Sequence, residues 1–203
     1  TELRGGKDIE LMLSWDGFDW RRPFRNSFFF ARAGGKKFES GSIFTNSTPV
    51  FLKDEIRFYY GAYSQGATDA DDTKPMSGIG LFTIPRDRFA GLRPVALSDQ
   101  PTLRKALHHI GQVTMKAIYL HDYDAITLNA DASKGEIRVE VLNARGYRMK
   151  GYTKEDAEVI TGDSLRHALA WNECTLANLP PGEYMLRIHM KKASVFAVNL
   201  IAE

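Results

Sequence analysis

The side chains that could do chemistry in this chain of 203 residues are mainly carboxylates and aromatic rings. Hydrolysis of a glycosidic bond needs two carboxylates that face each other across the scissile bond, roughly 5 to 10 Å apart. Glu39 stands at the start of an aromatic-rich stretch and could contribute to such a site, although a solvated or substrate-orienting role is the favoured alternative. Asp54 and Glu55 belong to the run "KDE", which is typical of a hairpin turn. The catalytic residue is therefore unknown, with Glu39 as the one candidate.

The stretch "SWDGFDWRRP" at residues 14–23 brings two tryptophans close together. The faces of Trp15 and Trp20 could stack on the C–H face of a sugar ring, as in other apolar contacts with rings. The alternative, which we favour, is that one ring packs between neighbouring sheets and the other lies on the surface. Asp16 precedes Gly17, and at such positions an aspartate accepts backbone N–H bonds within a turn. We therefore expect a turn here, with a sugar platform as the functional interpretation.

A second aromatic cluster comprises Tyr59, Tyr60 and Tyr63. Neighbouring residues of a strand face opposite sides, so Tyr59 or Tyr60 belongs to the core. The other tyrosine could line a channel with Tyr63 and hydrogen-bond a sugar hydroxyl. We retain Tyr60 and Tyr63 as candidate substrate-binding residues.

Metal-binding and nucleotide-binding patterns are scarce. The polar loop at residues 64–78 carries Asp69, Asp71 and Asp72, whose oxygens could hold Ca²⁺. A solvated loop is the favoured alternative because the Gly-and-Glu frame of an EF-hand is absent. The five histidines form no HExxH or other zinc pattern, and neither a P-loop nor a Gly-x-Ser-x-Gly motif is present. We expect no cofactor, with Ca²⁺ as the one ion left open.

The elements that must position these residues are almost all β-strands. Short runs of β-branched and aromatic residues are separated by Gly, Pro, Asn and Asp, which is typical of all-β proteins. In "GEIRVEVLN" the apolar residues Ile137, Val139 and Val141 alternate with Arg138 and Glu140, which predicts one buried face and one wet face. Helix is expected only as short pieces at residues 99–109 and 153–159.

Bulk composition excludes several classes of partner. A formal net charge of +2, with dispersed Lys and Arg, gives no reason to expect nucleic acid. No apolar run approaches the roughly 18 residues of a membrane span, so we expect no membrane partner. The single cysteine, Cys174, excludes an intrachain disulfide framework and does not settle the compartment, for which a secreted or periplasmic location is the expectation. A composition shift predicts two domains, at residues 1–95 and 96–203.

Three segments of the first half carry a resemblance to a known group of proteins. They are "LSWDGFDWRRP", "SGSIFTNSTPVFLKDEIRFYYGAYS" and "GIGLFTIPRDRFAGLRP". Together they resemble the last part of a five-bladed β-propeller in bacterial proteins grouped with glycoside hydrolase families 32 and 43. The positions that carry the resemblance are Ser14, Asp16, Gly17, Trp20, Tyr59, Tyr60, Gly61, Gly80, Leu81, Asp87 and Phe89. The second half resembles the C-terminal β-sandwich that such proteins carry.

The resemblance implies a fold and a partner. Residues 1–95 would form the last one or two blades of a propeller, and residues 96–203 a jelly-roll-like β-sandwich. The three catalytic carboxylates of that group lie on early blades, which have no counterpart in this chain. Either the chain is part of a longer polypeptide, or a second chain completes the propeller.

Three functions remain open. The first is the C-terminal portion of a glycoside hydrolase that acts on an oligosaccharide or polysaccharide, with its catalytic carboxylates upstream. The second is a non-catalytic carbohydrate-binding module, and the third is a structural or assembly domain. The segment alone is not expected to be catalytic.

Overall fold

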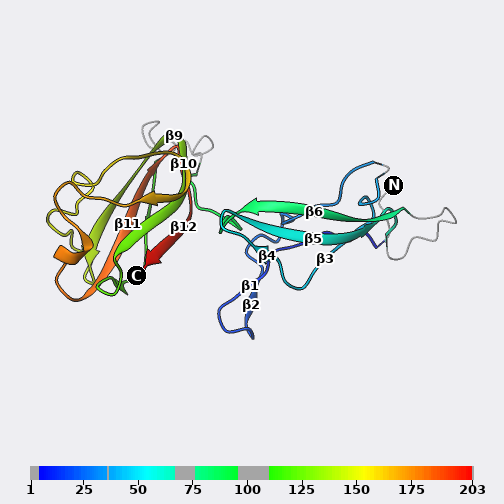
Figure 1. Ribbon diagram of the computed structural model, residues 1–203, viewed down its shortest axis with the longest axis horizontal. Coiled ribbons are helices and arrows are strands. Elements are labelled where there is room, and N and C mark those ends of the chain that lie inside the picture. The colour runs from blue at the N-terminus through cyan, green and yellow to red at the C-terminus, as the bar shows by residue number, and fades with distance from the viewer. Residues whose placement is uncertain (1–4, 36, 67–75, 96–109, 203) are drawn as a thin grey trace, which may run out of the picture. The chain divides into compact units, whose positions relative to one another are not determined.

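The computed structural model describes residues 5–35, 37–66, 76–95 and 110–202 (Figure 1). The protein is all-β and built from antiparallel pairings, which confirms the predicted fold class. The chain divides into two compact units, Thr1–Ile84 and Pro85–Glu203, and the sequence had predicted a boundary after residue 95. Among the described residues, no helix is long and apolar enough to span a membrane.

Unit 1 contains a small hairpin and a four-stranded sheet. Strands β1 (Leu13–Ser14) and β2 (Trp20–Arg21) form the hairpin. In the sheet, β3 (Ser42–Thr45) and β4 (Val50–Phe51) pair antiparallel with different parts of β5 (Glu55–Tyr63), and β6 (Ser77–Pro85) also pairs with β5. Figure 1 shows the hairpin standing away from this sheet.

One face of the unit 1 sheet is covered by aromatic packing. The ring of Phe82 stacks on Phe58 at 4.6 Å and on Phe30 at 4.2 Å between centroids. A side chain at Gly78 would collide with the Phe38 ring, and one at Gly80 would collide with the Tyr60 ring. The glycines of "SGIGLF" therefore make room for the aromatic side chains of this small core.

The opposite face of the same sheet is exposed and apolar. Because Gly80 faces Tyr60, the alternation of a strand places Ile79 and Leu81 on the other side of the sheet. Ile79 keeps 84% of its surface exposed, and its large neighbours on that face, drawn from β3, β5 and β6, are also exposed. We call this the open face, and its large side chains are Phe44, Tyr59, Tyr63, Ile79 and Leu81.

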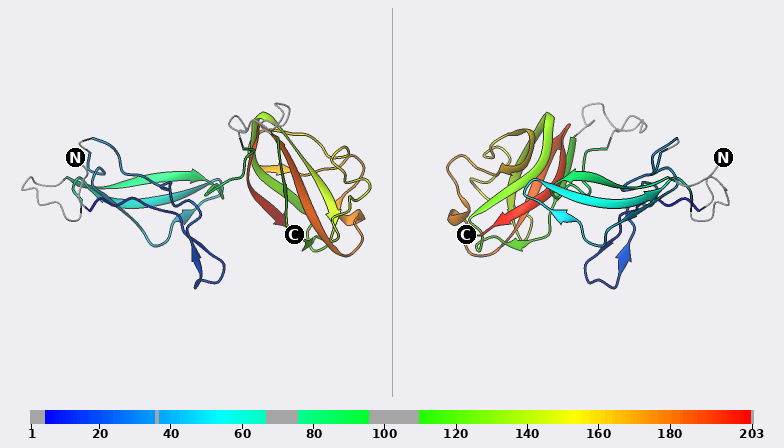
Figure 2. Two further views of the ribbon diagram at one scale, coloured as in Figure 1. Left: turned by 180° about the vertical axis from the view of Figure 1, so that it is seen from behind. Right: turned by 45° about the vertical axis from the view of Figure 1, so that its right-hand side comes forward.

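Unit 2 is a β-sandwich whose two layers share one strand. Strand β9 (Ala125–Asn143) pairs through its first part with β10 (Ile160–Ala168) and β12 (Ser194–Ile201), and through its second part with β11 (Glu183–Lys191). The short strands β7 (Ile110–Thr114) and β8 (Ile118–Tyr119) pair with β11. In Figure 2 the layers can be followed from β11, drawn in orange, and β12, drawn in red, which take different paths.

The change of layer occurs where β9 bends, between the residues paired with β12 and those paired with β11. Asp131 is the last residue of β9 paired with β12, and Glu136 is the first paired with β11. A Cβ atom at Gly135 would lie 1.8 Å from the Lys191 carbonyl oxygen, so only glycine fits at the bend. The predicted inward residues Ile137, Val139 and Val141 are fully buried between the layers, as the alternation required.

The segment that follows β6 is anchored to the sandwich by Arg88, which explains why unit 2 begins before the predicted boundary. The Arg88 Nε donates to Oδ1 of the buried Asn129 at 2.8 Å, and the Asn129 amide donates to the Arg86 carbonyl at 2.7 Å. The guanidinium also pairs with Asp163 and lies 4.5 Å from the centre of the Phe196 ring. Asn129 therefore accepts one hydrogen bond from this segment and donates another to it, and the two bonds hold the segment in place.

The helical pieces differ from the sequence expectation. Residues 99–109 lie outside the described residues, and 153–159 form a hydrogen-bonded turn instead of a helix. In that turn, Asp156 accepts from the backbone and hydroxyl of Thr153, and the Ala157 amide donates to the Thr153 carbonyl. Ala157 then bridges to Trp171, which ends the turn. A 3₁₀ turn at Leu176–Asn178 was not predicted.

Glu140 is buried, although the alternation of its strand predicted that it would lie on the solvent-exposed face. Its side chain is only 2% exposed, because Arg148, Arg187 and His189 surround it. The Arg148 Nε lies 2.7 Å away, the His189 Nε2 3.0 Å and the Arg187 Nη1 3.3 Å. Burial alone would raise the pKa of Glu140, but hydrogen bonds from His189 and Arg148 outweigh it, so the pKa lies below its usual value. The buried carboxylate is thus surrounded by two arginines and one histidine.

We expect Glu140→Gln to lower the free energy of unfolding by about 2 kcal/mol at neutral pH, because charged hydrogen bonds are lost in a buried position. A carboxylate whose pKa is lowered by folding stabilises the fold above its unfolded value of about 4.3, and that contribution disappears as the pH falls through the lower folded value. The difference between the variant and the wild type should therefore shrink in acid. Urea denaturation between neutral pH and pH ~3 measures it.

The matched control is Glu155→Gln, since Glu155 pairs with the same Arg148 but its side chain is 69% exposed. This variant should unfold like the wild type at every pH. Equal stability of the Glu140 variant and the wild type at neutral pH would contradict the proposed role of the buried carboxylate.

Candidate functional site

The β1–β2 hairpin is held by a network centred on Asp16. One oxygen, Oδ1, accepts from the backbone amides of Phe18 and Asp19, each at 2.8 Å, and from the Ser14 hydroxyl at 3.0 Å. These bonds, with the Asp19 amide foremost, hold the pKa of Asp16 below its usual value. Gly17 adopts a left-handed conformation, with φ of +80°. The predicted turn role of Asp16 is confirmed.

The hairpin presents its aromatic rings to solvent. Trp15 is 99% exposed and Trp20 57% exposed, so neither ring packs in a core formed by the described residues. The favoured expectation, that one ring packs between neighbouring sheets, depends on blades that this chain does not contain and stays a prediction. Phe18, between them, is also exposed and was not singled out from the sequence. We call Trp15, Phe18 and Trp20 the aromatic hairpin.

Two contacts restrain the aromatic hairpin. The Trp20 Nε1 donates to the Gly17 carbonyl at 3.1 Å, which fixes the indole against its own turn. At the base, the Arg22 Nε lies 3.0 Å from both carboxylate oxygens of Glu10. This hydrogen bond is the main reason that the pKa of Glu10 is lowered. A preset aromatic surface loses less conformational freedom on binding than a mobile one.

The tyrosine cluster is divided between the two faces of the sheet. Tyr60 is only 6% exposed and packs in the small core, whereas Tyr59 and Tyr63 lie on the open face. The expected pairing of Tyr60 with Tyr63 in one binding surface is therefore incorrect, because residues three apart on a strand point to opposite sides. Tyr59 is the residue that shares a face with Tyr63.

Glu39 and Tyr60 form a hydrogen-bonded pair. The Tyr60 hydroxyl donates to the Glu39 Oε2 at 2.5 Å. Burial, followed by the nearby carboxylate of Glu39, raises the pKa of Tyr60 to about 12. Glu39 is half-buried at the edge of this core, so the contact orients it. The geometry gives Glu39 a structural partner, and the catalytic role considered for it stays a hypothesis.

The metal candidates Asp69, Asp71 and Asp72 lie outside the described residues. Among the residues that are described, no group of three or more His, Cys, Asp or Glu side chains is arranged to hold a metal ion. Two histidines make structural contacts: His167 Nε2 lies 3.2 Å from the Ala130 carbonyl oxygen, and His189 contacts Glu140.

Sequence reasoning missed the open face of the sheet. In the strand "SGIGLFTIP", Gly78, Gly80 and Phe82 lie on the covered side of the sheet. The residues between them lie on the other side. That alternation was a usable signal, since it sets Ile79 and Leu81 opposite the aromatic core.

Comparisons with protein-family models, with curated proteins and with solved structures found no match to this chain.

We expect Asp16→Ala to loosen the hairpin without unfolding unit 1, because the bonds it removes all lie within residues 14–19. Amide hydrogen exchange at Phe18 and Asp19 should accelerate to the rate of an unprotected loop. Asp19→Ala is the control, since Asp19 contributes its backbone amide and not its side chain to this network. Unchanged protection in the Asp16 variant would contradict the assignment.

Proposed function

We propose that this chain is the carbohydrate-binding portion of a larger carbohydrate-active protein, with the catalytic carboxylates of any hydrolase outside the chain. The observation that carries the proposal is the aromatic hairpin, on which Trp15 and Trp20 are exposed, the Asp16 network orders the turn and the Trp20 indole donates to the Gly17 carbonyl. Large apolar rings are costly to leave in water, and restrained exposed rings of this kind are typical of interaction sites. Sugar rings present C–H faces that match them.

The hairpin also carries polar groups. The exposed side chains of Asp19 and Arg21 can hydrogen-bond sugar hydroxyls. Binding to a neutral glycan would then combine ring stacking with a few polar contacts, which is the usual composition of a small-molecule site. The proposal names no particular sugar or linkage.

The proposal includes a partner for unit 1. Its sheet has one covered face and one open face with Phe44, Ile79 and Leu81 exposed. Blades of a β-propeller pack face to face, so a neighbouring blade from the same or a second chain is the occupant that we propose for the open face. This contact supports assembly as the second candidate function.

We expect Trp15→Ala and Trp20→Ala each to weaken glycan binding about tenfold, the loss that follows when one stacked ring contributing about 1.4 kcal/mol is removed. Tryptophan fluorescence of the wild type, titrated with a panel of neutral oligosaccharides, selects the ligand. Calorimetry with that ligand then compares the variants, whose folds should be intact because the rings are exposed.

Tyr147→Ala is the matched control, because Tyr147 is an exposed aromatic residue of unit 2 outside the hairpin. It should bind as the wild type does. If the tryptophan variants also bind as the wild type does, or if no oligosaccharide binds, the hairpin is not a glycan surface.

The second candidate is tested by Ile79→Lys, which places a charge on the open face. Sedimentation of this variant with the blade-containing partner or a second copy should show weaker association, with glycan binding unchanged. Unaltered association would argue against the open face as an assembly surface.

A further inference from the structure

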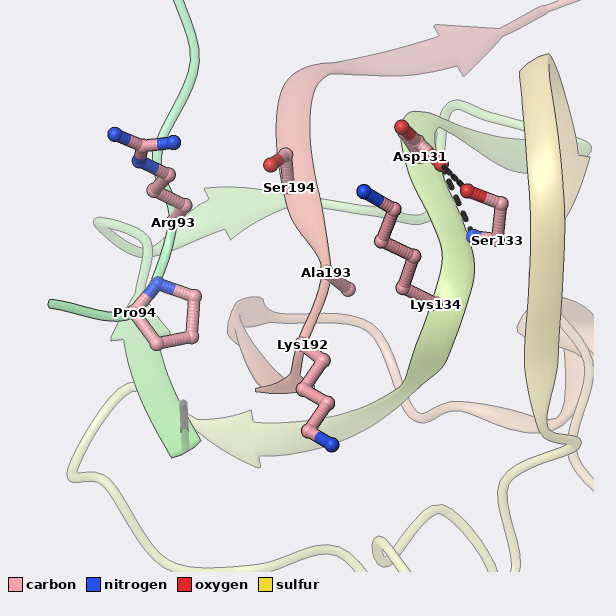
Figure 3. Close-up of a pocket in the computed structure, with 8 residues that line it drawn as sticks. All are labelled: Arg93, Pro94, Asp131, Ser133, Lys134, Lys192, Ala193 and Ser194. Carbon is pink, nitrogen blue, oxygen red and sulfur yellow. Dashed lines mark hydrogen bonds between the residues drawn. The ribbon is translucent and has the colours of Figure 1, made fainter. Parts of the chain in front are cut away.

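A pocket of about 430 Å³ lies on unit 2, beside the bend of β9 (Figure 3). Three segments line it. The bend contributes Asp131, Ser133 and Lys134, and the segment before the sandwich contributes Arg93. The third segment contributes Lys192 from the turn after β11 and Ser194 from the start of β12. The volume lies in the range of small-molecule sites, which is about 300 to 1,000 Å³.

The lining contains three cationic side chains, Arg93, Lys134 and Lys192, and one carboxylate, Asp131. Among the described residues, no salt bridge joins Arg93, Lys134 or Lys192 to a carboxylate. The neighbouring Lys191 differs, since it pairs with Glu136 at 3.7 Å and does not line the pocket. Three cations against one carboxylate leave an excess of positive charge around the hollow, which attracts a negatively charged ligand.

The one carboxylate of the pocket, Asp131, is hydrogen-bonded to Ser133. Asp131 accepts from the Ser133 amide at 3.0 Å and from the Ser133 hydroxyl at 2.6 Å, and these bonds keep its pKa low. Figure 3 shows this pair on one side and the Lys134 side chain extending from the bend toward the segment with Ser194. A carboxylate has further lone pairs, so Asp131 can still accept from a ligand hydroxyl.

The backbone of the bend and of the turn determines where the Lys134 and Lys192 side chains leave the chain. Lys192 has a φ of +47°, a left-handed conformation that glycine adopts without strain and a lysine does not. The bend and the turn approach so closely that a side chain at Gly135 would strike the Lys191 carbonyl oxygen. Lys192 is thus held in an unfavourable conformation at the pocket, and strain of this kind clusters at functional sites.

We propose that this pocket binds a tetrahedral oxyanion ester, a sulfate or phosphate group, carried by a polyhydroxylated ligand such as a sugar. Lys134 pairs with the anionic group, Arg93 and Lys192, whose side chain extends away from Lys134 in Figure 3, add to the positive field, and Asp131 and Ser194 hydrogen-bond the hydroxyls. The site lies in unit 2 and does not depend on the aromatic hairpin, so it goes beyond the function proposed above.

The test compares three matched probes: glucose, a glucose carrying a sulfate ester on its primary hydroxyl, and the corresponding phosphate ester. Calorimetry and amide chemical shifts of the full chain should show binding of both esters at the amides of Lys134 and Lys192, and none of glucose. Preference between the esters identifies the natural substituent. Affinity should fall with added salt, because the cations are exposed.

The decisive variant combines Lys134→Gln with Lys192→Gly. Its thermal midpoint should be no lower than that of the wild type, since glycine relieves the strain at position 192, while affinity for the esters falls at least about tenfold. Lys191→Gln, one residue away but outside the pocket, should bind as the wild type does. Equal binding of glucose and its esters, retained affinity in the double variant, or no shifts with any probe would each overturn the proposal. None of these outcomes bears on the tryptophan variants.

Discussion

A β-sheet in water is stable only when its apolar side is covered, and the two units meet this requirement in different ways. Unit 2 closes on itself because β9 runs through both layers of the sandwich. The bend at Gly135 makes this crossing feasible, and the turn at Lys192 packs directly against it. The core, the charged outer face around Glu140 and the pocket beside the bend all follow from the path of that one strand.

Unit 1 satisfies the same requirement on one side only. Its covered face is filled by Phe30, Phe58 and Phe82, whose rings stack above strands that keep glycine where the rings need room. The opposite face and the hairpin leave apolar side chains in solvent. We propose that these exposed apolar side chains take part in binding, with another sheet on the open face and a sugar on the rings of the hairpin.

Alternation and turn chemistry account for what could be predicted from the sequence. The buried series Ile137, Val139 and Val141 and the turn at Asp16 both follow from local rules. The burial of Glu140 could not be predicted, because two of its partners, Arg187 and His189, come from strand β11, more than 40 residues away in the chain. The exposure of both hairpin tryptophans was equally hidden, since a local pattern does not say which elements pack on a turn.

The most direct test of the carbohydrate proposal uses the three tryptophans of the chain. Trp171 is buried and its indole N–H donates to the Val139 carbonyl at 2.8 Å, so it serves as an internal reference for Trp15 and Trp20. The measurement is the indole N–H region of the ¹H–¹⁵N spectrum during titration with an oligosaccharide. The proposal predicts that the signals of both hairpin tryptophans shift while that of Trp171 stays in place. A titration that leaves both hairpin signals unmoved, or moves only Trp171, would contradict it.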